Sequence, residues 1–364
     1  GYFSYDSIRY IENIPNNCKD DLKIPDVRLL RPRTLIIYDN LKKKIFYIFN
    51  IFFDEKISNY SKKYSEIKTE LSKLIIQTFS KNLDNSNKIK SKKIKIKSNT
   101  TKGKFLKMVN KAKKYIKIGD IFQVVLSQRF EAKLSKKPIE IYKKLRLTNP
   151  SPFMFYFNFS DFQIIGASPE ILVRLRDNKI TVRPIAGTRP RGKSLTQDKF
   201  YEKDLLKDKK ELSEHLMLLD LGRNDAGKVS KINTVKVTES FVIERYSHVM
   251  HIVSNVVGKY NRKFSKFKSL LAGFPAGTVS GAPKIRAMEI IDELEKNKRK
   301  LYAGGIGYFT PNNEFDTCIA LRTALIKKDN FYVQAGAGIV ADSRPEKEYA
   351  ETVNKAKALM KAVD

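Results

Sequence analysis

The order of the predicted elements indicates a mixed α+β fold. Strand-like segments come in runs, at residues 153–184 and 301–342, and helical patterns lie between them at 197–221 and 283–296. Strict alternation of strand and helix would favour a doubly wound parallel sheet instead. Hydrophobic residues make up 41% of the 364 residues, which is enough for a sizeable core and excludes a wholly disordered chain.

The first hundred residues predict two segments that precede the main domain. Within residues 1–55, TLIIYDN and KKKIFYIFNIFF predict a β-hairpin that turns at Asp39-Asn40. Helical spacing of Ile67, Leu71, Leu74 and Ile75 predicts a helix, and a low-complexity linker rich in Lys follows it. We therefore expect three parts: residues 1–55, residues 56–99, and a main domain at 100–364.

The main domain begins with a helix that we expect to end at Gly119. Hydrophobic periodicity and the Gly, Pro and Asn positions then set the remaining elements. These are a strand at 122–134, a helix at 138–148, β-rich segments at 153–184, helices at 197–221 and 283–296, strands at 301–310, 318–328 and 330–342, and a closing helix at about 345–361.

The net charge of +32 raises the possibility of a nucleic-acid partner. Residues 56–117 hold 19 Lys, no Arg and three acidic residues, and so carry half of this excess. The segment lacks Arg for base contacts and interleaved aromatic residues for stacking. We favour a solvated linker and expect no nucleic-acid partner, with a basic nucleic-acid-binding protein as the alternative of another class.

The cysteine content, the hydropathy and the first residue indicate the compartment of the protein and the extent of the chain. Only Cys18 and Cys318 occur, which excludes a disulfide scaffold and indicates a reducing cytoplasm. No run of about 18 apolar residues is present, so we expect no membrane association. The chain opens on Gly1 in a strand-like segment, and we expect a fragment whose N-terminal part is lacking.

Two pairs of glutamates carry the first candidate chemistry. Glu211 and Glu214 lie three residues apart in one predicted helix, as do Glu348 and Glu351 in another. Each pair therefore lies on one helix face. If the two faces meet, the all-oxygen donor set suits Mg²⁺. The spacing alone fits two ordinary exposed pairs better, and this alternative stays open.

Glycine-rich junctions and one histidine are the other candidates. The junctions are PIAGTRPRG (184–192), FPAGTVSGAPK (274–284) and QAGAGIVAD (334–342), each near Arg or Lys, which together suggest a small anionic ligand. Each one alone reads as a tight turn. His251 is either a general base or, as is commoner, a structural histidine, and no His/Cys grouping has zinc spacing.

Taken together these motifs are specific. GASPEILVR (166–174), ELSEHLMLLDLGRND (211–225), ERYSHVMHIVS (244–254) and QAGAGIVADSRPEKEYAETVNKA (334–356), with the first two junctions, resemble the chorismate-utilising enzymes, most closely their anthranilate-forming branch. The resemblance runs from about residue 100 to 360. It implies the chorismate-binding-enzyme fold, a β-sheet sandwich core with helices packed outside. Residues 1–50 resemble the end of that family's N-terminal regulatory domain.

The resemblance also implies residue roles. Glu214 and Glu351 would bind Mg²⁺, with Glu211 and Glu348 behind them through water. Glu170 would protonate the leaving C4 hydroxyl of chorismate, and His251 would assist the loss of pyruvate. The remaining pocket residues would bind the substrate: Thr188, Tyr302, Arg322, Gly336, Gly338 and Lys355.

Two positions separate the branches of the family. Gln123 stands where the isochorismate-forming and salicylate-forming members carry a Lys that activates water, and Ala186 stands where aminodeoxychorismate-forming members usually carry a Lys. Both favour anthranilate, with aminodeoxychorismate as the alternative product. The implied partner is a glutamine amidotransferase subunit (component II) that supplies ammonia, in a heterotetramer of two subunits of each kind.

A regulatory site is implied only in part. The segment NPSPFMFYF resembles one half of the family's tryptophan feedback site, through Asn149, Pro150, Pro152, Phe153 and Met154. The other half would lie in the N-terminal segment that we expect to be lacking.

Overall fold

The computed structural model describes residues 1–52, 54–80, 95–246 and 249–360. The Lys-rich stretch at 81–94, predicted as a linker, lies outside the described residues. The chain forms two compact units, one made of residues 1–28 and 91–364 and the other of residues 29–90.

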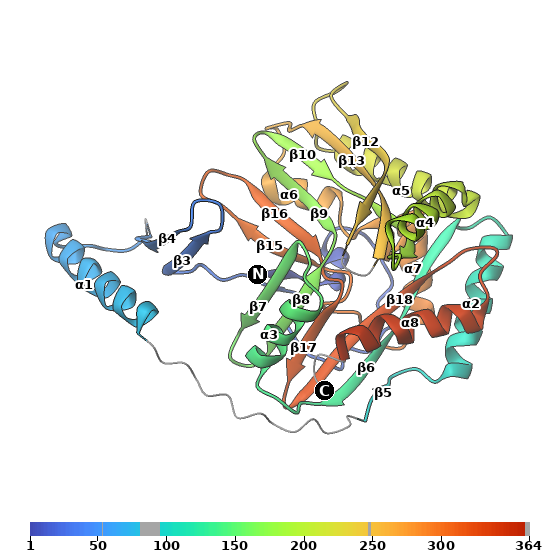
Figure 1. The fold of residues 1–364 in the computed structure, drawn as a ribbon, viewed down its shortest axis with the longest axis horizontal. Helices are drawn as coiled ribbons and strands as arrows, with labels where there is room; N and C mark the ends of the chain where they lie inside the picture. Colours follow the sequence, from blue (N-terminus) through green and yellow to red (C-terminus); the bar gives the residue numbers. More distant parts are fainter. Residues whose placement is uncertain (53, 81–94, 247–248, 361–364) are drawn as a thin grey trace. The chain divides into compact units, whose positions relative to one another are not determined.

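Two antiparallel sheets build the first unit (Figure 1). The nine-stranded sheet has the order β11-β13-β10-β9-β16-β15-β1-β2, with β12 paired to β13, and the seven-stranded sheet has the order β14-β6-β18-β17-β8-β7, with β5 paired to β6. The strands of the larger sheet are β1 (Tyr2–Phe3), β2 (Val27–Arg28), β9 (Ile171–Arg176), β10 (Lys179–Val182), β11 (Ile185–Pro190), β12 (Lys236–Arg245), β13 (Val249–Lys259), β15 (Gly305–Phe309) and β16 (Phe315–Ile319). Those of the smaller are β5 (Lys97–Ser98), β6 (Gln123–Lys133), β7 (Phe153–Asn158), β8 (Gln163–Ser168), β14 (Gly281–Ala282), β17 (Thr323–Lys327) and β18 (Asn330–Ile339).

The two sheets share one hydrophobic core. Leu172 and Leu175 of β9 belong to the same buried cluster as Val124 and Leu126 of β6. Burial of these apolar side chains between the sheets is the main force that holds the layers together. The predicted α+β fold with a sandwich core is therefore confirmed.

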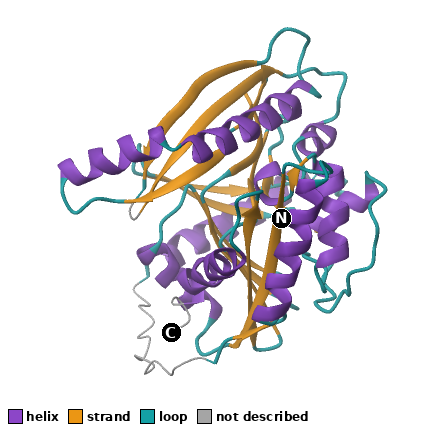
Figure 2. Cartoon of the chain, turned by 90° about the vertical axis from the view of Figure 1, so that its right-hand side faces the viewer, coloured by secondary structure: helices purple, strands orange, loops and turns teal. Residues whose placement is uncertain are grey.

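Helices cover the outer sides of the strands (Figures 1 and 2). They are α2 (Lys102–Lys117), α3 (Pro138–Thr148), α4 (Leu195–Lys207), α5 (Lys209–Gly227), α6 (Lys266–Ala272), α7 (Lys284–Leu294) and α8 (Pro345–Met360), with short 3₁₀ turns η1 (Tyr5–Tyr10) and η2 (Gly277–Val279). Ala356 and Leu359 of α8 share a second cluster with Phe130 and Val333 of the smaller sheet. None of the described helices has the length and apolar character needed to cross a membrane.

The single helix predicted at 197–221 is wrong, because the chain forms α4 and α5 there. Asp208 lies between them with an extended ψ of 101°, and its side chain accepts hydrogen bonds from the backbone N–H groups of Lys210 and Glu211. An Asp in this role satisfies donors that a helix start leaves free, so a new helix begins at Lys209. As a result, Glu211 and Glu214 lie in the first two turns of α5 and not in mid-helix.

The strand predicted at 318–328 is also divided. β16 ends at Ile319 in the larger sheet, and β17 begins at Thr323 in the smaller one. Arg322 lies in the connection with a φ of 46°, a left-handed conformation that few side chains adopt. The chain thus crosses between the sheets at a residue predicted to bind substrate.

The second unit contains the predicted hairpin and helix. Strand β3 (Thr34–Asp39) pairs with β4 (Lys44–Phe49), and Thr34 lies opposite Phe49. Helix α1 (Tyr60–Phe79) starts at Asn59, whose side chain accepts from the Lys62 backbone N–H at 2.9 Å.

The compact units do not coincide with the expected division at residues 55 and 99. The reason is that β1 pairs with β15, so residues 1–28 join the large unit through the sheet. Tyr2 lies opposite Ile306 in this pairing and is fully buried.

Candidate active site

Gln123, the first residue of β6, contacts Glu214 of α5. The Gln123 Nε2 atom donates to the Glu214 carboxylate at 2.9 Å. A carboxylate only accepts hydrogen bonds, so the amide nitrogen of Gln123 must point to Glu214. The amide oxygen Oε1 then points away from Glu214, and it is buried without a hydrogen-bond partner among the described residues. Gly338 borders both side chains, since a Cβ there would lie 2.4 Å from Gln123 Nε2. Any larger residue at 338 would displace Gln123.

Lys355, Gly336 and Tyr302 form the neighbouring part of the pocket. The Lys355 ammonium group pairs with Glu351 at 2.6 Å and donates to the Gly336 carbonyl oxygen at 3.1 Å. A Cβ at position 336 would lie 2.6 Å from the Tyr302 hydroxyl. Burial raises the pKa of Tyr302 to about 12, so this hydroxyl stays protonated and can donate.

The two carboxylate pairs lie on α5 and α8. Burial, and after it the charge of Glu214, raises the pKa of Glu211. Burial and the charge of Glu351 raise the pKa of Glu348, and the charge of Lys210 on α5 lowers it. This last effect puts the start of α5 near α8.

The two glutamate pairs are candidate metal ligands by their spacing. Over the ranges that the structure describes, no group of three or more His, Cys, Asp or Glu side chains is arranged to hold a metal ion. Their mutual repulsion and all-oxygen chemistry are the features that suit a hard cation.

His251 is held in one tautomer on β13. Its Nδ1 atom lies 2.9 Å from the Gly187 carbonyl oxygen and 3.0 Å from the Thr188 hydroxyl. A carbonyl oxygen cannot donate, so Nδ1 carries the proton and Nε2 keeps a free lone pair. Burial lowers the pKa of His251, which keeps the ring neutral at neutral pH. A Cβ at Gly187 (φ 67°) would lie 3.3 Å from Glu211 Oε2, so the glycine that accepts from His251 also borders this carboxylate.

Arg322 is a half-buried cation close to His251. Its charge lowers the pKa of His251, and burial lowers the pKa of the Arg322 guanidinium itself. Within the part of the chain that the structure describes, no carboxylate forms an ion pair with Arg322. A guanidinium that is partly desolvated and lacks an anion is suited to bind a carboxylate from outside the chain.

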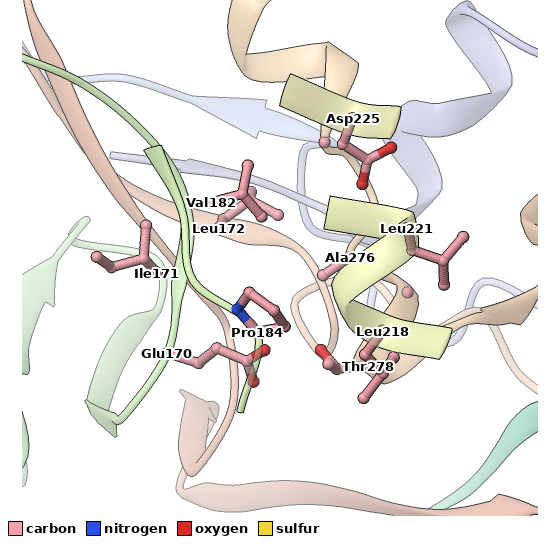
Figure 3. Close-up of a pocket in the computed structure, with 12 residues that line it drawn as sticks. Glu170, Ile171, Leu172, Val182, Pro184, Leu218, Leu221, Asp225, Ala276 and Thr278 are labelled. Carbon is pink, nitrogen blue, oxygen red and sulfur yellow. The ribbon is translucent and has the colours of Figure 1, made fainter. Parts of the chain in front are cut away.

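Glu170 lies in the connection between β8 and β9 and is only 5% exposed. Burial raises the pKa of Glu170 to about 8, and the Thr278 hydroxyl and the Ile185 backbone N–H oppose this shift only in part. The carboxyl group is therefore mostly protonated at neutral pH, as a general acid requires. A small cavity lies against it, bordered by Thr278 and by α5 (Figure 3).

Sequence reasoning did not single out Thr278, although it lies inside the quoted junction FPAGTVSGAPK. The available signal was a hydroxyl residue in the middle of a Gly-rich turn, but only the fold brings that turn to Glu170.

The segment predicted as part of a tryptophan site lies elsewhere in the unit. Asn149 follows the last turn of α3, Pro150 and Pro152 lie in the connection, and Phe153 and Met154 begin β7. β7 is an edge strand, separated from β18 by β8 and β17, so these residues are not brought to the pocket of Gly336 and Gly338.

Known proteins are similar to this chain in sequence and in fold. The pattern of the family described as chorismate binding enzyme matches residues 1–361. Proteins called anthranilate synthase component 1 are similar to the whole chain: that of Cereibacter sphaeroides is 51% identical and that of Acetivibrio thermocellus 50% identical, over 73% and 74% of their own lengths.

Two solved structures share the fold. Anthranilate synthase component I from Streptococcus pneumoniae TIGR4 matches with a TM-score of 0.91 and 39% identity, over 99% of this chain and 79% of that one. A 2,3-dihydroxybenzoate-specific isochorismate synthase from Bacillus anthracis matches with a TM-score of 0.67 and 26% identity, over 75% of each chain. The chain belongs to the family of chorismate binding enzymes.

Proposed function

We propose that the chain is the synthase component of an anthranilate synthase, which converts chorismate and ammonia to anthranilate and pyruvate. The observation that carries this proposal is Gln123 beside Glu214 in the pocket. An amide cannot take a proton from water, whereas the lysine of the water-using branches can. Its unpartnered Oε1 atom can instead accept an N–H from ammonia. The names of the relatives and Ala186 support the same choice of product.

The pocket residues fit the two carboxylates of chorismate. Arg322, Tyr302 and the backbone of Gly336 and Gly338 would bind the carboxylate of the pyruvyl ether, with Thr188 and Lys355 lining the same pocket. Arg322 is the strongest support, because it is a half-buried cation without an ion-pair partner in the described ranges. A dianionic ligand would supply the missing charge.

We propose Mg²⁺ as the cofactor. Glu214 and Glu351 would hold it, with Glu211 and Glu348 behind them through water. The donor set fits, because two like-charged pairs with raised pKa values at Glu211 and Glu348 favour the arrival of a cation. When bound, the ion supplies positive charge for the ring carboxylate of the substrate.

The protein's own groups can carry the proton transfers. Glu170 is protonated at neutral pH and donates to the C4 hydroxyl, which leaves as water while ammonia adds at C2. His251 accepts the C2 proton at Nε2, since Nδ1 is already protonated. Loss of pyruvate then gives the aromatic ring. Closure of the pocket around the substrate would keep water from competing with ammonia.

The term "component" in the relatives' names implies a second subunit. We propose that it is a glutamine amidotransferase that supplies ammonia, in a heterotetramer with two subunits of each kind. We place the assembly in the cytoplasm, which the two free cysteines, Cys18 and Cys318, support. Tryptophan feedback through Phe153 and Met154 is part of the same proposal.

The test is to incubate the purified chain with chorismate, Mg²⁺ and an ammonium salt. Anthranilate fluorescence together with equimolar pyruvate is the expected result. Aminodeoxychorismate without pyruvate would replace the anthranilate assignment by its alternative, and absence of both products would overturn the proposed activity.

A further inference from the structure

A small cavity lies behind Glu170, on the side of α5 (Figure 3). Its volume is about 20 Å³ and its walls are mainly apolar, from Ile171, Leu172, Val182, Leu218 and Leu221. Glu170, Thr278 and Asp225 are its only ionisable or hydroxyl-bearing lining residues in the described ranges. Residues 218, 221 and 225 recur on one face of α5, so the lining extends along about 10 Å of that helix.

The chemistry of the cavity points to a bound water. The Thr278 hydroxyl is fully buried and makes no hydrogen bond of ordinary geometry with a described residue, although it faces Glu170 closely enough to lower its pKa. Buried hydroxyls almost always have a partner. A cavity needs about 10–15 Å³ to hold one water, together with two or more polar neighbours. This cavity meets both requirements through its volume and the two side chains.

A water in this cavity can reprotonate Glu170 between turnovers. In the proposed reaction it loses a proton to the C4 hydroxyl in every turnover, and it must regain one before the next. The side chain is buried, and bound chorismate would close the front of the pocket to solvent. The protons must then come from behind.

The far end of the cavity lining leads toward solvent. Asp225 is buried there and accepts from Lys284 at 2.6 Å. It also pairs with Lys228 at 3.3 Å, whose side chain is 49% exposed. Lys228 thus connects the buried Asp225 carboxylate, which lines the same cavity as Thr278, with the surface.

We propose that a water in this cavity, together with the Thr278 hydroxyl, returns a proton to Glu170 after each turnover, and that Asp225 connects the water to solvent. The inference rests on the proposed function. The Glu170 O–H bond breaks as the C4 hydroxyl leaves as water. Thr278 then passes a proton from the cavity water to the carboxylate, and solvent replaces it through Asp225. The nitrogen loses one proton to solvent as ammonia becomes an amino group, so the protons balance.

The main test compares Thr278→Val, which removes the hydroxyl but keeps the shape, with Thr278→Ser, which keeps the hydroxyl. We expect the Val variant to lose about tenfold or more in kcat, with the KM for chorismate unchanged and a larger solvent deuterium isotope effect. Imidazole, a small proton donor, should partly restore its kcat. The Ser variant should resemble wild type, as should Thr196→Val on the exposed surface of α4.

Three results would overturn the relay. The first is a Val variant with wild-type kcat. The second is a slow Val variant that shows neither imidazole rescue nor a changed isotope effect, which would mean that Thr278 only packs. The third is a wild-type crystal structure with no water within hydrogen-bond distance of Thr278 Oγ1, a measurement that does not depend on any variant folding. Failure of the proposed function is separate, because wild type would then make no anthranilate.

Discussion

Replacement of Glu170 by Gln should slow catalysis strongly and at the same time stabilise the protein at neutral pH. Gln has nearly the same shape but cannot donate a proton from a carboxyl group, so we expect kcat to fall by about 10²- to 10⁴-fold. The stability effect follows from the same buried position, because the fold raises the pKa of this carboxyl group from 4.5 to about 8.

The destabilisation caused by the buried Glu170 increases with pH. Below a pH of 4.5 the carboxyl group is protonated in both the folded and the unfolded chain, and it imposes no pH-dependent cost. As the pH rises to about 8, the unfolded chain ionises while the folded chain resists, so wild type loses stability. Through this group the free energy of unfolding of wild type falls by about 3 kcal/mol by pH 7 and by about 5 kcal/mol above pH 8. Glu170→Gln avoids this loss.

Denaturant titrations of both proteins at about pH 5, 7 and 8.5 measure the difference. We expect a gap in the free energy of unfolding that widens with pH and then levels off above the folded pKa. Glu346→Gln, at an exposed position on α8, is the matched control and should change stability by less than about 0.5 kcal/mol at each pH. A gap that stays constant with pH, or full activity in Glu170→Gln, would refute the reasoning.

Three further substitutions test the rest of the pocket. Glu351→Gln should remove Mg²⁺-dependent turnover and leave the fold intact, since its exposed ion pair with Lys355 contributes less than about 1 kcal/mol; turnover that still responds to Mg²⁺ would exclude Glu351 as a ligand. His251→Met should accumulate the amino intermediate, seen by chromatography, and normal anthranilate output would rule out the base. Arg322→Gln should raise the KM for chorismate by roughly 30- to 100-fold through loss of a charged hydrogen bond, whereas an unchanged KM would mean that Arg322 does not bind the substrate.

Elements with strong local signals were predictable from the sequence. Helix α3 begins at Pro138, a residue whose fixed φ suits the first helical position, and its observed range equals the predicted 138–148. Helix α2 ends just before Gly119, which adopts a φ of 87° as a terminating glycine does. Such signals act over a few residues and need no information from distant parts of the chain.

Elements that depend on distant partners were predicted less well. Asp208 lies in a helix-compatible run of residues, and besides capping α5 it pairs with Arg189 of β11 at 2.8 Å, a partner that the local pattern does not contain. The break at Arg322 arises because β16 pairs with β9 and β17 pairs with β8, so the chain must change sheets between them. Neither pairing is visible in the local pattern.

The sequence by itself determined which chemical groups are available and which share a helix face, as Glu211 and Glu214 do. Only the tertiary structure decided their state. Gln123 meets Glu214 across 91 positions of chain, and His251 meets Gly187 across 64. Hydrogen bonds over such separations select the tautomer of His251 and the orientation of Gln123, and burial decides that Glu170 holds its proton at neutral pH. Desolvation and distant neighbours set proton affinity, and both exist only once the chain has folded.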